Sequence, residues 1–152
     1  MALSLHLLFY LIKKSIQLLI QLRMTLFSKI IAGQIPSFKI VENDKFYAFL
    51  DIFPSAEGHT LVVPKIEVDR IFDLPVEYLE ELLSFAKPIA DAIKKAFPCD
   101  RINILTLGFE VPHAHLHLIP MNGMGDADIV ANKTKPSQDE LRKVQEKILQ
   151  YL

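Results

Sequence analysis

The segment PHAHLHLIP, at residues 112–120, limits the possible folds of this chain more than any other stretch. Histidines alternate in it with small or apolar residues, and the side chains of an extended strand alternate between its two faces. We therefore predict a strand over residues 113–119 that turns His113, His115 and His117 to one side and apolar residues towards a core. Because imidazoles gain little from packing side by side and repel one another when protonated, the row indicates a functional site.

Short runs rich in aromatic and β-branched residues predict four more strands. Two of them, at residues 38–43 and 46–52, are separated by polar residues and are expected to form a hairpin. The others lie at residues 59–65 and 102–108. Since all five strands follow one another mostly through turns, we expect a single antiparallel sheet.

Two helices are expected beside this sheet. Asp73 as N-cap and Pro75 in the first turn begin the longer helix, and Pro88 inside it predicts a kink or a local break. Ser137 and Glu140 form a capping box that begins a C-terminal helix. The fold class is therefore α+β, with a five-stranded antiparallel sheet, one long helix across it and a C-terminal helix. Apolar residues at helical spacing are Leu79, Leu82, Leu83, Ala86, Ile89, Ala90, Ile93 and Phe97 in the first helix, and Leu141, Val144 and Ile148 in the second.

Composition excludes some classes of partner. The 17 basic and 18 acidic side chains leave a net charge of -1, which does not favour a long anionic polymer, so no nucleic acid is expected as a partner. The only cysteine, Cys99, cannot form an internal disulfide, which suits a reducing compartment, and we expect a cytoplasmic protein. A chain of 152 residues is long enough for one domain with a buried core.

The first 23 residues differ from the rest, because they are mostly apolar and carry basic but no acidic side chains. We therefore divide the chain into a leader at residues 1–23 and a domain at residues 24–152. Lys13 and Lys14 interrupt the apolar run well short of the roughly 20 residues that a transmembrane helix needs. The leader is either an amphipathic helix for a membrane surface or for import into an organelle, or the result of a start assigned too early, with Met24 as the true beginning.

Two kinds of chemistry use such a row of histidines. Residues i and i+2 of a strand can point at one transition-metal ion, and His59 can supply a further ligand. Alternatively, one imidazole attacks phosphorus and forms a phosphoramidate that water later cleaves, while its neighbours fix its tautomer and carry a proton. No carboxylate lies within the row, and the spacing alone leaves both possibilities open.

The segments GHTLVVPK at residues 58–65 and EVPHAHLHLIP at residues 110–120, taken together, resemble the histidine-triad (HIT) family of nucleotide hydrolases and transferases. FSKIIAGQIPS at residues 27–37 and AFLDIFPSAEGH at residues 48–59 are similar to the opening segments of that family, in the same order. The resemblance covers roughly residues 25–121.

The resemblance implies a role for each histidine of this site. His115, in the middle, matches the nucleophile that attacks the α-phosphorus, and His113 and His117 match the members that orient it and contact the phosphate. His59 matches the histidine of the Gly-His segment that joins their hydrogen-bond network. No metal and no cofactor are implied for the chemical step.

The resemblance also implies residues that bind the nucleotide. Asp51 matches the acid that binds the ribose hydroxyls, and Gly108 and Glu110 fall where the family holds phosphate. Glu110 is either a proton donor to the leaving group or a solvated acid. Phe109 stands where the family has a glutamine, a departure that bears on the grip on the phosphate. The apolar residues that match those around the base are Phe27, Ile30, Phe49 and Ile52.

The function that the resemblance implies is hydrolysis of a P–N or P–O bond at the α-phosphorus of a purine nucleoside monophosphate derivative, through a covalent nucleotidyl-histidine. Such an enzyme is a nucleoside phosphoramidase or a dinucleoside polyphosphate hydrolase, and the family is typically a homodimer. Two alternatives stay open: a nucleotide-binding or signalling module without turnover, and a metal-dependent hydrolase that uses the histidine row as ligands.

Overall fold

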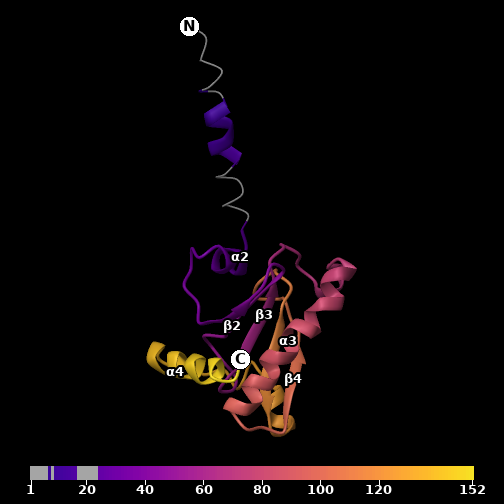
Figure 1. Ribbon diagram of the computed structural model, residues 1–152, viewed down its shortest axis with the longest axis vertical. Helices are drawn as coiled ribbons and strands as arrows, with labels where there is room; N and C mark the ends of the chain where they lie inside the picture. Colours follow the sequence, from indigo (N-terminus) through magenta and orange to yellow (C-terminus); the bar gives the residue numbers. More distant parts are fainter. Residues whose placement is uncertain (1–6, 8, 17–23) are drawn as a thin grey trace.

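The computed structural model describes Leu7, residues 9–16 and residues 24–152 (Figure 1). From Thr25 onward, a short helix is followed by three strands, a long helix, two more strands and a last helix. The elements in chain order are α2 (Leu26–Ile31), β1 (Lys39–Glu42), β2 (Phe46–Leu50), β3 (Thr60–Pro64), the 3₁₀ helix η1 (Ile71–Asp73), α3 (Val76–Ala96), β4 (Arg101–Leu105), β5 (Leu116–Met121), the 3₁₀ helix η2 (Met124–Ala127) and α4 (Gln138–Leu149).

Part of the predicted leader is described. Residues 9–16 are helical and exposed to solvent. The rest of the leader, apart from Leu7, lies outside the described residues, so the division of the chain at Met24 stays a prediction. None of the helices in the described ranges is long and apolar enough to span a membrane.

The five strands form one sheet in the order β1-β2-β3-β5-β4, and every neighbouring pair is antiparallel. The β1–β2 hairpin turns at Asn43, whose side-chain oxygen accepts hydrogen bonds from the N–H groups of Lys45 (2.9 Å) and Phe46 (2.7 Å). An asparagine that captures the backbone in this way stabilises a tight turn. The predicted α+β class with its sheet, long helix and C-terminal helix is confirmed, as are the strands expected at residues 38–43, 46–52, 59–65 and 102–108.

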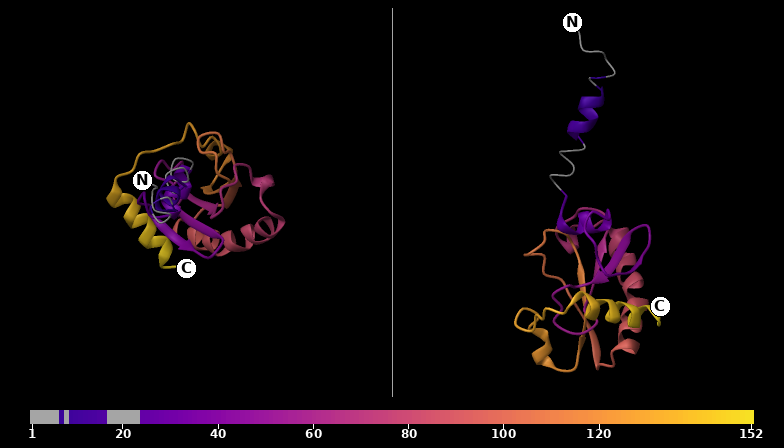
Figure 2. Two further views of the ribbon diagram at one scale, coloured as in Figure 1. Left: turned by 90° about the horizontal axis from the view of Figure 1, so that it is seen from above. Right: turned by 90° about the vertical axis from the view of Figure 1, so that its left-hand side faces the viewer.

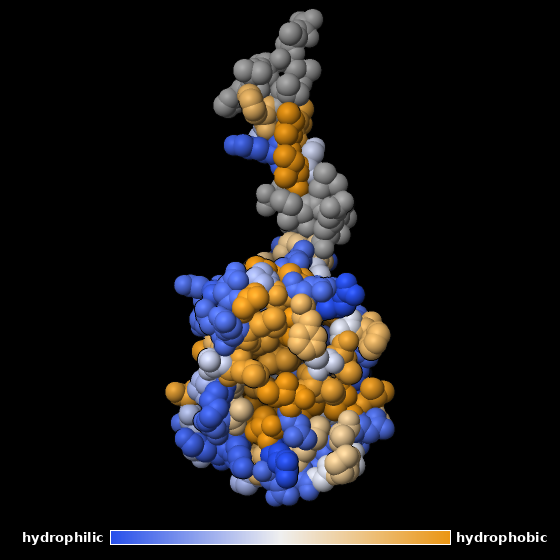
Figure 3. Space-filling model, turned by 90° about the vertical axis from the view of Figure 1, so that its right-hand side faces the viewer, coloured by the Kyte–Doolittle hydropathy of each residue, from blue (hydrophilic) through white to orange (hydrophobic). Residues whose placement is uncertain are grey.

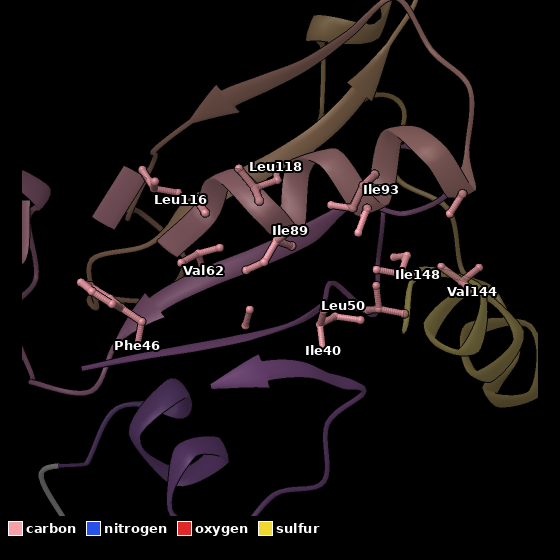
Figure 4. Packing of buried hydrophobic residues seen from close by; sticks show 14 of the residues in the cluster. Ile40, Phe46, Leu50, Val62, Ile89, Ile93, Leu116, Leu118, Val144 and Ile148 are labelled. Carbon is pink, nitrogen blue, oxygen red and sulfur yellow. The ribbon is translucent and has the colours of Figure 1, made fainter. Parts of the chain in front are cut away.

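The larger hydrophobic core lies between the sheet and helices α3 and α4 (Figures 2 and 4). Val62 of β3, Leu118 of β5 and Ile89 of α3 belong to it, and Leu50 of β2 lies beside Ile148 of α4. All five are at most 1% exposed. Burying an aliphatic side chain of this size stabilises a fold by about 1.5–3 kcal/mol. This core therefore holds β2, β3 and β5 together, and with them the residues at the strand ends.

The opposite face of β2 and β3 packs against α2. Alternation along these strands turns Phe49 and Leu61 away from the larger core, and they form a second cluster with Phe27 and Ile30 of α2. Every residue of β2 and β3 is buried as a result. His117 of β5 pairs with Leu61 across the sheet, so its ring lies on the face that α2 covers.

The long helix differs from the prediction at three positions. Asp73 does not cap α3, because it ends η1, and α3 begins at Val76. A kink or a local break was predicted at Pro88, and the prediction of a break is wrong, since the helix is continuous there. Pro88 lies on the exposed side, where water can satisfy the carbonyl that loses its helical partner. Leu83, expected on the buried face, is 56% exposed.

The last strand begins later than predicted. β5 covers Leu116–Met121 instead of residues 113–119, so His113 and His115 precede it. The N–H of Ala114 donates to the carbonyl of Val68 (2.7 Å) outside the sheet ladder. A sequence period of two cannot reveal this bend, because it depends on the partner that the backbone finds.

Helix caps explain the two remaining helices. The capping box of Ser137 and Glu140 is confirmed at the start of α4, where the Glu140 carboxylate accepts the N–H of Ser137 (2.7 Å). Helix α2 was not predicted, because six residues span less than two turns and carry no periodic signal. Its start is fixed by Thr25, whose side chain accepts the N–H of Ser28 (3.1 Å).

Gly58, just before β3, yields a test of the fold. Its φ of +90° suits glycine alone, and a Cβ would lie 2.9 Å from a ring carbon of Phe97. We expect Gly58→Ala to lower the free energy of unfolding by roughly 2–4 kcal/mol, measured by urea denaturation.

Two other glycines separate the causes of that loss. Gly33 has a φ of +72°, but nothing lies near the position that a Cβ would take. Gly33→Ala should therefore lower the free energy of unfolding by only about 1 kcal/mol. Gly123 has open space around the position of a Cβ, and its φ is not in the left-handed region. Gly123→Ala should therefore change the free energy of unfolding by less than about 0.5 kcal/mol. Equal effects at all three positions would contradict the close approach of Gly58 to α3.

Candidate active site

Four histidines from separate parts of the chain meet on the α2 face of the sheet. His59 lies directly before β3, His117 lies in β5, and His113 and His115 lie in the segment that leads into β5. Their exposed fractions are only 0–8%. Antiparallel pairing of β3 with β5 brings His59 to His117, although 58 residues separate them in the sequence.

Three of these rings form one continuous chain of hydrogen bonds. His59 Nε2 lies 2.9 Å from His117 Nδ1, and His117 Nε2 lies 3.1 Å from His115 Nε2. At one end of the chain, the backbone N–H of Ser55 donates to His59 Nδ1 (3.2 Å). At the other end, His115 Nδ1 lies 2.6 Å from the carbonyl oxygen of His113. We call this chain, from Ser55 to the His113 carbonyl, the histidine relay.

The two ends of the histidine relay fix the tautomer of every ring. A carbonyl only accepts, so His115 Nδ1 carries a proton and His115 Nε2 carries a lone pair. The Ser55 N–H only donates, so the proton of His59 is on Nε2, from which it reaches His117 Nδ1. His117 Nε2 then donates to His115 Nε2. Each ring is thus neutral, and the lone pair of His115 Nε2 accepts the proton of His117 Nε2.

His113 stands outside the histidine relay and supports it. Its Nε2 donates to the carbonyl of Pro64 (2.8 Å), so its Nδ1 accepts the hydroxyl proton of Thr25 (2.8 Å). These two bonds tie His113 to the end of β3 and to the cap of α2. The carbonyl that orients His115 is therefore itself held on two sides.

Burial keeps the imidazoles neutral. It lowers the pKa of His113, His115 and His59 below the ordinary value of 6.5, and for His59 the nearby Asp51 carboxylate only partly opposes this effect. Burial, with the positive fields of its histidine neighbours, lowers the pKa of His117 to about 3. A neutral imidazole is the form that can act as a nucleophile, and burial keeps His115 in this form at neutral pH.

Asp51, His59 and His117 are the group of described residues that could hold a metal ion, since their ligand atoms lie within 4.8 Å of one another. His59 Nε2 lies 3.8 Å from the Asp51 carboxylate. A metal on Nε2 would move the proton of His59 to Nδ1, where the Ser55 N–H already points. Both ring nitrogens of His113 are hydrogen-bonded, to Thr25 and to the carbonyl of Pro64, so His113 lies outside this group.

The predicted base-binding residues are mostly brought to the histidines. The ring of Phe27 meets those of His115 (5.1 Å between centroids) and Phe49 (5.6 Å) edge to face. Ile30 is buried in the same cluster. Ile52 is 49% exposed and lies just beyond the end of β2. Phe27 and Ile30 of α2 and Phe49 of β2 together form an apolar wall beside the histidines, so two separate elements contribute to it.

Asp51 lies at the end of β2, beside His59. One of its carboxylate oxygens accepts the N–H of Phe53 (2.9 Å), and the other faces His59. Beside these two residues a cavity of about 270 Å³ extends towards α4. It is lined by Leu50, Asp51, Pro54, Ala56, Glu57, Gly58, His59, Thr134, Pro136, Glu140, Leu141 and Val144.

The two predicted phosphate-binding residues lie in the segment between β4 and β5. Gly108 has φ +79°, and the side where a Cβ would stand faces two oxygens of Asp69 at 4.0 Å. Glu110 is exposed, and both of its carboxylate oxygens accept hydrogen bonds from Lys133 Nζ, at 2.9 and 3.1 Å. A role for either residue in phosphate binding stays a prediction.

The sequence model of the HIT domain matches residues 32–124. The chain belongs to the HIT domain family. It is 39% identical over 133 residues to the adenosine 5'-monophosphoramidase of Saccharomyces cerevisiae, and the match covers 84% of this chain and 82% of the relative. The resemblance of the sequence to the HIT family is thereby confirmed.

Solved HIT structures agree with the fold. A HIT-like protein from Bartonella henselae, described as involved in cell-cycle regulation, has a TM-score of 0.72 and 33% identity over 84% of this chain and 96% of its own. A zinc-bound histidine triad family protein from Mycobacterium smegmatis has a TM-score of 0.65 and 28% identity over 82% of this chain and 92% of its own.

Three residues of this HIT site escape sequence reasoning. Thr25 carries a recognisable signal, since threonine is among the residues preferred at the N-cap of a helix. Ser55 acts through its backbone N–H, which any residue except proline provides. Lys133 lies beyond the residues matched by the HIT domain model and has no local pattern.

The buried histidines predict how stability depends on pH. Because their pKa values are lower in the folded state, the unfolded chain binds more protons below pH 6.5, and the free energy of unfolding should fall as pH falls. Each histidine contributes up to about 1.4 kcal/mol per pH unit. Urea unfolding between pH 7.5 and 5 measures this slope.

A matched variant tests whether the buried histidines cause this dependence on pH. The double substitution His59→Gln and His117→Gln removes two of the titrating rings and should make the slope shallower. A profile that is flat between pH 7 and 5.5 in the unsubstituted protein would show that the rings are not buried in neutral form.

Proposed function

We propose that this protein hydrolyses a P–N or P–O bond at the α-phosphorus of a purine nucleoside monophosphate derivative, with a covalent nucleotidyl intermediate on His115. The observation that supports this most is the lone pair on His115 Nε2, which the histidine relay leaves unprotonated in a buried site. The relative from Saccharomyces cerevisiae is named an adenosine 5'-monophosphoramidase, and we therefore favour a P–N bond and adenosine.

The first step transfers the nucleotidyl group to the protein. His115 Nε2 forms a bond to phosphorus, and the bond from phosphorus to the leaving group breaks with its electron pair going to that group. The His117 Nε2 proton, released from its hydrogen bond to His115, passes to the leaving group, which departs protonated. The His113 carbonyl stabilises the positive charge that develops on His115 through the Nδ1 proton.

The second step restores the enzyme. The oxygen of water attacks phosphorus, the bond to His115 Nε2 breaks, and a nucleoside monophosphate leaves. One proton of the attacking water passes to His117 Nε2, in place of the one that the leaving group took, and the other stays with the nucleoside monophosphate. The histidine relay thereby returns to its first state. Asp51 is well placed to accept hydrogen bonds from the ribose hydroxyls, and Phe27 and Phe49 offer an apolar wall to the base.

His115→Ala tests this proposal. We expect it to lower turnover of adenosine 5'-phosphoramidate by on the order of 10³-fold or more, because the nucleophile is gone, while AMP still binds. Mass analysis of the unsubstituted protein, quenched in alkali during turnover, should show an adenylyl group on the peptide that carries His115.

The two alternatives give different results in the same assay. A protein that only binds nucleotides would show AMP binding with no turnover and no adduct before any substitution. A metal-dependent hydrolase would lose activity in excess EDTA and regain it with zinc or manganese. We expect full activity in EDTA.

We further propose that the protein is a homodimer. Strand β4 is an edge of the sheet, so its outer backbone groups have no strand beside them. Ile104 of β4 is 52% exposed, and on α3 Val76 is 66% and Leu83 56% exposed. Figure 3 shows hydrophobic residues gathered on the side of the domain where α3 and β4 lie. Two copies that pair these surfaces about a twofold axis would cover both the edge of β4 and the exposed apolar residues of α3.

Charged substitutions test the dimer. We expect Leu83→Glu combined with Ile104→Glu to convert the dimer into a folded monomer, because the interface would then bury negative charges that have no positive partner. Light scattering after gel filtration gives the mass. Tyr151→Lys, at the exposed C-terminal end, is the control and should leave the mass unchanged. An unsubstituted protein that is monomeric at high concentration would contradict the dimer.

A further inference from the structure

Within the described residues, the four neutral histidines of the site supply no positive charge of their own. A nucleotide phosphate is an anion, and the Asp51 carboxylate beside His59 adds a further negative charge. The rings cannot balance these charges, because burial lowers their pKa values. A phosphate-binding site of this kind needs a cation or several backbone N–H groups.

The connection between η2 and α4, residues 128–137, brings a lysine to this place. It crosses the side of the domain away from α3 as an open strap (Figure 2). Thr134 fastens it, because both its N–H (2.9 Å) and its hydroxyl (2.8 Å) donate to the carbonyl of Pro54. Pro54 lies between Asp51 and His59, so the strap is joined to the loop that delivers both of them.

Lys133, next to Thr134, reaches from the strap to the second loop of the site. Its Nζ donates to both carboxylate oxygens of Glu110, three residues before His113. Its positive charge also contributes, after burial and their other neighbours, to the lowered pKa values of His59 and His117. Lys133 therefore lies within electrostatic range of the histidine relay, between the two loops that form it.

We propose that Lys133 binds the phosphate oxygens of the substrate, and that Glu110 holds the lysine in place until substrate arrives. This inference rests on the proposed function. Both side chains are partly exposed, at 36% for Lys133 and 78% for Glu110, so the ion pair is weak enough to exchange one anionic partner for another. Glu110 is then neither a proton donor nor an isolated solvated acid, but a competitor of the phosphate for one cation.

The two members of the ion pair should act in opposite directions on nucleotide binding. We expect Lys133→Met to raise the Kd for AMP roughly tenfold, because a charge-assisted hydrogen bond to phosphate is lost. Glu110→Gln removes the competing carboxylate and should lower the same Kd by about threefold. Lys133→Arg, which keeps the charge, should stay within about threefold of the unsubstituted protein.

Isothermal titration calorimetry with AMP measures all these constants. Lys135→Met removes a lysine from the same exposed strap and should leave the Kd unchanged. If the ion pair only holds the strap in shape, Lys133→Met and Glu110→Gln will both weaken binding, or neither will change it, and the proposal is overturned. If the unsubstituted protein binds no AMP, the proposed function itself fails. If it binds AMP and Lys133→Met leaves the Kd unchanged, only the inference about Lys133 fails.

Discussion

The hydrogen bond between His115 Nδ1 and the carbonyl of His113 is the constraint on which the rest of the site depends. It places the proton of His115 on Nδ1 and leaves Nε2 unprotonated, so that Nε2 accepts the proton of His117 Nε2. The bend that precedes β5 makes this bond possible, because a residue inside the strand would have its carbonyl in the sheet ladder. The reactive ring is thus oriented by an irregularity of the backbone, at the point where a regular strand begins.

The sheet fulfils a second condition, which is to keep this network dry. β2 and β3 are covered on both faces, by the larger core on one side and by α2 on the other. Helix α2 is short, yet Phe27 from it contacts the rings of both His113 and His115. The same apolar contacts that exclude water from the imidazoles also lower their affinity for protons. Packing and reactivity therefore have one cause here.

Much of this could be predicted from the sequence. The period of two in residues 113–119 identified the histidines. Turn and strand signals predicted the sheet, and capping residues with helical spacing predicted both larger helices. What could not be predicted depends on contacts between distant residues. The bend before β5 needs the carbonyl of Val68, and the tautomer of His59 needs the backbone of Ser55. The exposure of Leu83 shows that helical spacing defines a stripe without fixing its width.

Lys133 and Thr134 lie on a connection that contacts the site only at its borders, at Glu110 and at the carbonyl of Pro54. The HIT domain model stops before this connection. A change of length or charge in it would leave the tautomers of the imidazoles as they are, while changing the field that an incoming anion meets. Under the role proposed for Lys133, a HIT protein could change which anions it accepts by varying one surface connection, while its four buried histidines stay the same.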